Sequence, residues 1–84
     1  MRTMKIYTKE GCGFSDSLRE LLEERNIPYE ETLVTLDSPE HHALGERAGS
    51  MKVPQAFIGV IPLGSAQEVQ AAAVNGMLDD LLVD

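Results

Sequence analysis

The chain has 84 residues, of which 43% are hydrophobic and 25% charged, a balance typical of one small globular domain spanning residues 1–84. Its formal net charge of -7 argues against binding to nucleic acid or to an anionic membrane surface, because both require a basic face. No apolar run approaches the roughly 20 residues needed to span a bilayer, and the first residues lack the apolar stretch of a signal peptide. We therefore expect a cytoplasmic, reducing location, in which the single cysteine forms no internal disulfide.

The first part of the chain alternates strand and helix patterns. Residues 5–8 are rich in β-branched and aromatic side chains, which predicts a strand. A helix follows and ends near residues 26–28, because apolar side chains recur there at the spacing of one helix face. These side chains are Phe14, Leu18, Leu21 and Leu22. Residues 29–36 predict the second strand.

The middle of the chain predicts a second helix and two further strands. Ser38 and Pro39 are typical of an N-cap and a first helical turn, and Gly49 is typical of the residue after a helix end. Residues 53–58 predict a third strand with a proline near its start, where the missing N–H is tolerated. Residues 61–63 predict a short fourth strand.

The last part of the chain predicts two helical segments. Ser65 and Glu68 have the spacing of a capping box and open a helix that breaks at residues 75–76. Residues 78–82 are rich in leucine and predict a short final helix. The early strand–helix–strand order implies a parallel strand pair with a crossover helix, and the later strand–strand–helix order implies a hairpin at the sheet edge. The chain is therefore expected to form an α/β domain.

The one cysteine, Cys12, lies between the first predicted strand and the first predicted helix. A helix N-terminus offers unpaired N–H groups and a partial positive charge, which favour a thiolate over a thiol. Lys9 adds a full positive charge, and Gly11 and Gly13 let the backbone turn tightly and other groups approach the sulfur. The alternative is an ordinary buried cysteine, which would be inert. The position between strand and helix, flanked by glycines, favours the reactive thiol.

Four segments of the chain together resemble the glutaredoxin family. Residues 6–15, Ile-Tyr-Thr-Lys-Glu-Gly-Cys-Gly-Phe-Ser, resemble its active-site segment, and residues 51–58, Met-Lys-Val-Pro-Gln-Ala-Phe-Ile, resemble its Thr-Val-Pro segment. Residues 63–68 lie where the family has a Gly-Gly motif followed by acids, and residues 76–82 resemble its usual ending. The resemblance implies a thioredoxin-like fold: a four-stranded mixed sheet, in the order βαβαββα, flanked by helices, with Pro54 in the cis form.

The resemblance also implies roles for several residues in a glutathione-dependent thiol–disulfide oxidoreductase. Cys12 would attack a glutathione mixed disulfide, and Lys9 would bind the glycyl carboxylate of glutathione and favour the thiolate. Val53, before a cis Pro54, would pair through its backbone with the cysteinyl part of glutathione. The Ala66 N–H, at a helix N-terminus, would bind the γ-glutamyl carboxylate.

Phe14, Lys52 and Gln67 complete the expected glutathione-binding set. Phe14 would flank the sulfur as an apolar wall, although its helical spacing with Leu18 equally indicates a core residue. Lys52 would be a second cation near Cys12 or a contact for a carboxylate, and the alternative is a solvated loop lysine. Gln67 stands where the family has the acid that pairs with the γ-glutamyl ammonium.

We expect weaker glutathione binding than in a typical family member, because the γ-glutamyl subsite departs from the family pattern. Gln67 forgoes the ion pair, and Ser65 replaces the second glycine of the usual pair. One lost charge-assisted hydrogen bond is worth about 1 kcal/mol. Glu68 would compensate for this loss if the capping box did not hold it.

Ser15 ends the Cys-Gly-Phe-Ser motif and replaces the resolving cysteine of two-cysteine family members. A hydroxyl forms no disulfide, so we expect a monothiol route in which Cys12 takes the glutathionyl group and a second glutathione removes it. The same motif marks monothiol members in which two subunits share a [2Fe-2S] cluster through this cysteine and two glutathiones. Those members usually carry a longer loop before the cysteine and a Trp-Pro pair, whereas this chain has no tryptophan. Cluster binding is therefore the alternative, and a homodimer is expected only with it.

The expected partners are glutathione and glutathionylated or disulfide-bearing proteins. A third interpretation is a domain of this fold that docks proteins and has little redox activity, because Ser65 and Gln67 weaken the glutathione site. His41 and His42 are adjacent and have no further ligand one helical turn away, so we expect a solvated helix start and no metal site.

Overall fold

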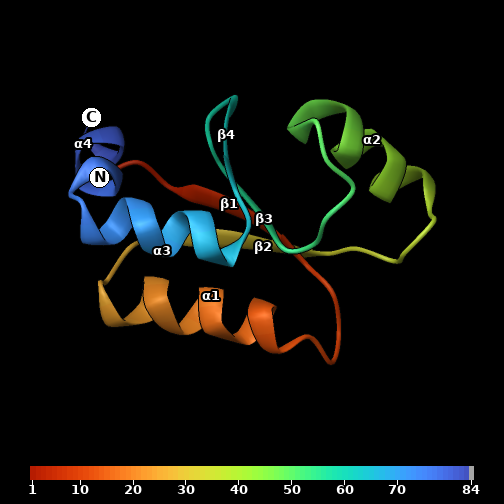
Figure 1. The fold of residues 1–84 in the computed structure, drawn as a ribbon, viewed down its shortest axis with the longest axis horizontal. Coiled ribbons are helices and arrows are strands. Elements are labelled where there is room, and N and C mark those ends of the chain that lie inside the picture. The colour runs from red at the N-terminus through yellow and green to blue at the C-terminus, as the bar shows by residue number, and fades with distance from the viewer. Residues whose placement is uncertain (84) are drawn as a thin grey trace.

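The computed structural model describes residues 1–83 and arranges them as a four-stranded sheet with helices on both sides (Figure 1). In chain order the elements are β1 (Met4–Thr8), α1 (Gly13–Glu24), β2 (Tyr29–Leu33), α2 (Pro39–Ala48), β3 (Gln55–Ile58), β4 (Ile61–Gly64), α3 (Ala66–Val74) and α4 (Met77–Leu82). This is the predicted order of strands and helices. Within the described chain, no helix combines the length and the apolar character that crossing a membrane requires.

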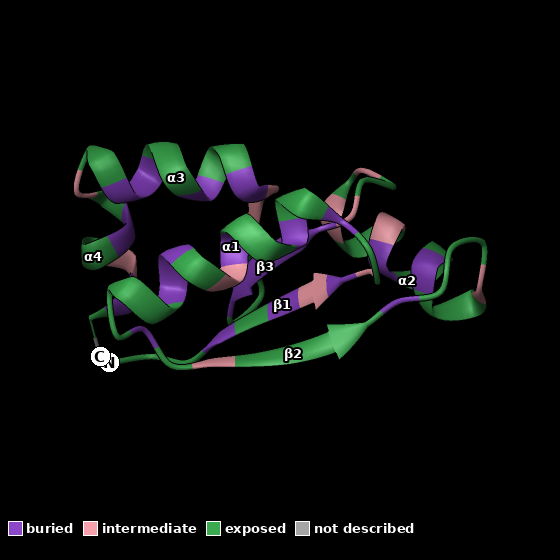
Figure 2. Ribbon diagram, turned by 90° about the horizontal axis from the view of Figure 1, so that it is seen from below, coloured by how far each residue is buried: buried purple, intermediate pink, exposed green. Residues whose placement is uncertain are grey.

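The sheet has the strand order β2-β1-β3-β4 and is mixed, as the family resemblance implied. β1 pairs in parallel with β2, which is reached through the crossover helix α1, and antiparallel with β3. β3 and β4 form the predicted hairpin at one sheet edge. β2 lies at the other edge and is exposed along most of its length (Figure 2). The expected four-stranded mixed sheet with flanking helices is therefore present.

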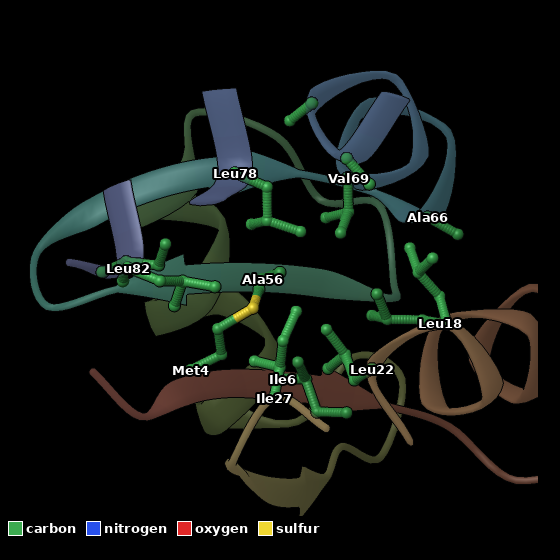
Figure 3. Close-up of a cluster of buried hydrophobic side chains, with 14 residues drawn as sticks. Met4, Ile6, Leu18, Leu22, Ile27, Ala56, Ala66, Val69, Leu78 and Leu82 are labelled. Carbon is green, nitrogen blue, oxygen red and sulfur yellow. The ribbon is translucent and has the colours of Figure 1, made fainter. Parts of the chain in front are cut away.

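The main hydrophobic core lies between the sheet and helices α1, α3 and α4 (Figure 3). Strand side chains enter it at alternate positions, because successive residues of a strand point to opposite faces. These are Met4 and Ile6 from β1 and Ala56 and Ile58 from β3. Leu22 of α1 is fully buried in the same cluster. This core holds α1 and α3 side by side, so the N-termini of both helices can border one site.

Helix α2 covers the opposite face of the sheet through a smaller cluster, formed by Val34, Leu44 and Phe57. Arg47 of α2 lies over two aromatic rings of the sheet, with its guanidinium carbon 5.2 Å from the centre of the Tyr7 ring and 5.6 Å from that of Phe57. A cation at this distance is attracted to the ring faces. The cluster and the arginine fix α2 against the sheet.

Two strands are shorter than the sequence predicts. β2 ends at Leu33 rather than at residue 36, because β1, its pairing partner, ends at Thr8, which lies opposite Leu33. The chain then turns at residues 36–38, with Asp37 in the left-handed region at φ 61°. β3 begins at Gln55 rather than at Val53, because Pro54 has no N–H to donate to the ladder. The Val53–Pro54 peptide bond is cis, as the resemblance implied.

Capping interactions fix where α2 and α3 begin, as the sequence predicts. The Ser38 hydroxyl accepts the His41 N–H at 3.1 Å, and Gly49 at φ 73° follows the end of α2. At the start of α3, the Glu68 carboxylate accepts the Ser65 N–H at 3.2 Å and also accepts the Ser65 hydroxyl.

Candidate functional site

Cys12 is the N-cap residue of α1 and ends the loop that follows β1. That loop turns at Gly11, whose φ of 67° is a conformation that favours glycine. The cysteine is 9% exposed, so protein surrounds it on most sides. The strand–loop–helix order therefore places the thiol at the N-terminus of α1, as predicted.

The pKa of the Cys12 thiol lies below its ordinary value. Burial is the largest single influence and raises the pKa, but the groups that favour the thiolate together outweigh it. These groups are the N–H and hydroxyl of Ser15, the N–H of Phe14 and the positive charge of Lys9. The electrostatics of the site therefore favour the reactive thiol over the inert one.

Ser15 contributes to the site in a way that the sequence analysis did not predict. Its side chain is fully buried, and its hydroxyl oxygen accepts the Lys9 N–H at 3.5 Å. The hydroxyl proton can then point toward Cys12, where it lowers the pKa of the thiol. The sequence did hold a signal for this contact: Ser15 follows Cys12 by three residues, which places it one helical turn from the N-cap.

A cleft of about 410 Å³ opens beside the Cys12 loop, within the size range of small-molecule sites. All the residues predicted to bind glutathione line it, namely Lys9, Phe14, Lys52, Val53, Pro54, Ala66 and Gln67. Leu36, Met51 and Ser65 complete the lining and were not predicted to bind glutathione. The fold thus brings together residues from distant parts of the sequence, although their roles stay predictions.

Lys9 and Lys52 are the charged side chains among the residues that line the cleft. In a chain with a net charge of -7, a lining that holds two lysines and no carboxylate makes the cleft locally positive. The N-terminus of α3, at Ala66, adds N–H groups and a partial positive charge. The cleft is therefore suited to a ligand that carries carboxylates.

Phe14 is 61% exposed and lines the cleft, so its interpretation as a core residue is wrong. The α1 residues that face the core are instead Ser15, Leu18, Leu21 and Leu22. Phe14 is the second residue of the helix, and the first turn directs it away from the core. With the exposed Leu36 and Met51, it gives the cleft an apolar rim.

Glu68 is not among the residues that line the cleft, because its carboxylate is bound to Ser65 at the start of α3. The hydrogen bond from the Ser65 hydroxyl is the main cause of a Glu68 pKa below its usual value. Gly64, at φ 103°, leaves room for this arrangement, since a Cβ there would lie 2.9 Å from the Glu68 Cβ. Glu68 therefore does not replace the acid that is missing at Gln67.

His41 is buried, so the solvated helix start predicted for it is wrong. Its Nδ1 accepts the Asp37 N–H at 2.9 Å, and its Nε2 lies 2.8 Å from the Met51 carbonyl oxygen. The signal in the sequence was the spacing Ser-x-x-His from Ser38, which resembles a capping box with histidine in place of the acid. His42 is exposed, and no group of three His, Cys, Asp or Glu side chains that could hold a metal occurs among residues 1–83.

Comparison with known proteins gives one consistent match. Residues 4–60 match the glutaredoxin family model. Glutaredoxin 3 of Escherichia coli is 29% identical over 82 residues, covering 98% of this chain and 99% of that protein. A Pseudomonas aeruginosa glutaredoxin is 32% identical over 83 residues, covering 98% of each chain. The crystal structure of a buckwheat glutaredoxin–glutathione complex has the same fold, with a TM-score of 0.83 and 23% identity over 94% of this chain and 74% of that one.

Replacing Ser15 with alanine removes the buried hydroxyl that lowers the pKa of the Cys12 thiol. We expect that pKa to rise, so that alkylation by iodoacetamide at neutral pH slows several-fold, because only the thiolate reacts. Mass spectrometry at a series of pH values follows the rate. Ser17→Ala is the matched control, since the exposed Ser17 hydroxyl donates to the Gly13 carbonyl at 3.0 Å instead. Identical pH–rate profiles for Ser15→Ala and the wild type would contradict this role.

Proposed function

The chain belongs to the glutaredoxin family of glutathione-dependent thiol oxidoreductases, and we propose that it works by a monothiol mechanism in which Cys12 alone carries the chemistry. The observation that carries the proposal is a thiol of lowered pKa in a loop from which Lys9 and the nearby Phe14 line a cleft, whose charged residues are both lysines. The proposed reaction removes glutathione from glutathionylated proteins.

The proposed reaction has two thiol–disulfide exchange steps. In the first, the Cys12 thiolate attacks the glutathione sulfur of a protein–glutathione mixed disulfide, and the substrate protein leaves as a thiolate. In the second, the thiolate of another glutathione attacks the glutathione sulfur now bound to Cys12. Oxidised glutathione leaves, and Cys12 returns to its thiolate form. One disulfide forms as another breaks in each step, so the reaction needs no further oxidant or reductant.

In this scheme the cleft residues hold glutathione with its sulfur near Cys12. The lysines, Lys9 and Lys52, attract its carboxylates, and the N-terminus of α3 at Ala66 receives the γ-glutamyl carboxylate. The Val53 backbone pairs with the cysteinyl part. Phe14 lies as an apolar wall along the cleft. The buckwheat protein of the same fold has been crystallised with glutathione, which supports the choice of ligand.

Ser15 excludes a two-cysteine route within one chain, because a hydroxyl cannot attack the Cys12 adduct and expel glutathione. The chain has no second thiol, so release depends on glutathione from solution. A monomer suffices for both steps. The proposal places the protein in the cytoplasm, where a reduced glutathione pool is available.

Incubation with oxidised glutathione should add one glutathionyl group, on Cys12, because this is the single thiol and its pKa is lowered. Peptide mass spectrometry locates the adduct, and Cys12→Ser is the control that should form none. With glutathione reductase, NADPH and a glutathionylated peptide, the wild type should turn over steadily.

The outcomes of these two assays separate the interpretations. A Cys12 that stays unmodified at neutral pH would sink the proposal. An adduct without turnover would instead favour the domain that docks proteins with little redox activity. Steady turnover of the peptide would exclude that interpretation.

Glutathione binding is expected to be weaker than in family members that have an acid in the γ-glutamyl subsite. Gln67 lines the cleft with a neutral amide, and the Glu68 carboxylate is bound to Ser65. The ammonium of the γ-glutamyl group therefore meets no carboxylate among the cleft residues. One missing charge-assisted hydrogen bond corresponds to about 1 kcal/mol, or about fivefold in Kd.

The substitution Gln67→Asp returns a carboxylate to the cleft. We expect the Kd of S-methylglutathione, measured by NMR titration, to fall about fivefold. Gln70→Asp is the matched control, because it adds the same charge to an exposed position of α3 outside the cleft. An analogue without the amino group should gain nothing from Gln67→Asp. An equal gain for both ligands, or for both variants, would show that the ammonium does not bind at residue 67.

A [2Fe-2S] cluster shared by two copies of the chain is the alternative function, favoured by the Cys-Gly-Phe-Ser motif. Such a cluster needs four ligands, normally cysteine thiolates. The described part of one chain offers the Cys12 thiol and no group of three His, Cys, Asp or Glu side chains that could hold a metal. One chain therefore does not fit the cluster by itself, and a second copy and two glutathione thiols would have to supply the other ligands.

Anaerobic reconstitution with iron, sulfide and glutathione distinguishes the two functions. Because the chain has no tryptophan and therefore lacks the Trp-Pro pair usual in cluster-binding members, we expect a colourless protein that elutes as a monomer from a size-exclusion column. A visible charge-transfer spectrum in a dimeric fraction, lost in Cys12→Ser, would establish the cluster instead.

A further inference from the structure

The His41 side chain takes no part in the proposed chemistry, yet it is 6% exposed and belongs to the few buried polar groups of the described chain. It lies in the first turn of α2, where its own N–H donates to the Ser38 hydroxyl at 3.1 Å. The ring folds back so that the Asp37 N–H donates to Nδ1 at 2.9 Å. Because Nδ1 accepts this hydrogen bond, the neutral ring carries its proton on Nε2.

The Nε2–H of the His41 ring donates to the Met51 carbonyl oxygen at 2.8 Å. Met51 directly precedes Lys52 and Val53 in the cleft wall. Its side chain rests on the same helix, because its sulfur occupies the space that a Cβ at Gly45 would need. Helix α2 therefore holds this wall by a hydrogen bond to the backbone and by a packing contact to the side chain.

The other nitrogen of the ring fixes a second part of the cleft lining. The peptide group that carries the Asp37 N–H also belongs to Leu36, which lines the cleft. One imidazole therefore joins two stretches of chain that border the same cleft, one before α2 and one after it. Both ring nitrogens are engaged, so the ring is not available as a metal ligand or a general base.

We propose that His41 is a positioning residue for the glutathione cleft, which sets the Met51–Val53 backbone against which glutathione binds. The inference rests on the proposed function, because that function assigns glutathione to this cleft. His41 is not among the residues that line the cleft, so it acts through the Met51 carbonyl rather than by touching the ligand.

The wall that His41 holds is separate from the groups that ionise Cys12. Those groups belong to Lys9, Phe14 and Ser15, in the loop after β1 and the first turn of α1. Loss of the ring should therefore weaken glutathione binding and leave the thiolate unchanged. We expect the KM for a glutathionylated peptide to rise about fivefold, as for one lost hydrogen bond, with kcat and the pH profile of Cys12 alkylation as in the wild type.

Two substitutions at His41 test its two ring hydrogen bonds, to Asp37 and to Met51, separately. His41→Gln puts an amide nitrogen near the place of Nε2, so it can still donate to Met51 but loses the acceptor for Asp37. His41→Asn puts an amide oxygen near the place of Nδ1, so it can still accept from Asp37 but does not reach Met51. If the Met51 bond positions the cleft, KM rises in His41→Asn and is restored in His41→Gln.

The controls are the same substitutions at His42, and nitrogen NMR of the wild type gives an independent test. His42→Asn and His42→Gln make the same changes at the exposed neighbour and should leave KM unchanged. Thermal melting establishes that each variant is folded before its kinetics are compared. Nitrogen NMR of the wild-type imidazole needs no variant: it should show a protonated Nε2 and an unprotonated Nδ1, and the reverse tautomer would overturn the proposal.

Failure of this inference and failure of the proposed function give different results. If the wild type neither binds S-methylglutathione nor turns over the glutathionylated peptide, both fall. Suppose instead that the wild type binds S-methylglutathione and turns over the peptide. If His41→Asn then has the KM of the wild type and the wild-type amide shifts at Lys52 and Val53, the positioning role is wrong and the proposed function stands.

Discussion

The chemistry proposed for this chain depends on the contact between the Cys12 sulfur and the first turn of α1. Burial by itself would keep the thiol protonated, but the N–H and hydroxyl of Ser15, with Phe14 and Lys9, reverse that preference. The chain holds no second thiol, so this thiolate is the one sulfur nucleophile available. Ser15 thus has two consequences: it removes the internal resolving thiol, and it stabilises the charge of the remaining one.

The fold builds the ligand cleft from loops and helix ends rather than from the sheet itself. The loop after β1, the segment around the cis Val53–Pro54 bond and the N-terminus of α3 meet there. Each is fixed by a different interaction: the turn at Gly11, the hydrogen bond from the His41 ring to Met51, and the Ser65–Glu68 cap. Since these interactions belong to different elements, binding of the ligand and ionisation of the sulfur can be altered separately.

Much of the fold could be predicted from the sequence, because its signals are local. Helix caps at Ser38 and Ser65 and the end at Gly49 depend on neighbouring residues, and the structure has all three. The environment of His41 was predicted wrongly, because its burial depends on Met51, which is distant in sequence and brought close by the fold. Phe14 fits the apolar spacing of α1 but lies in its first turn, where spacing does not decide whether the side chain reaches the core.

The residues of the candidate site could be predicted from the family resemblance, whereas the pKa of Cys12 depends on contacts that form only in the folded chain. The proposed chemistry requires that folding lowers the pKa of the Cys12 thiol, which an ultraviolet titration of the thiolate measures. The chain has one cysteine, so the signal reports on that sulfur alone once the tyrosine contribution is subtracted with Cys12→Ser. We expect the thiolate to persist to lower pH in the folded protein than in the same chain unfolded in urea. Equal titration in both states, or a higher pKa in the folded one, would contradict it.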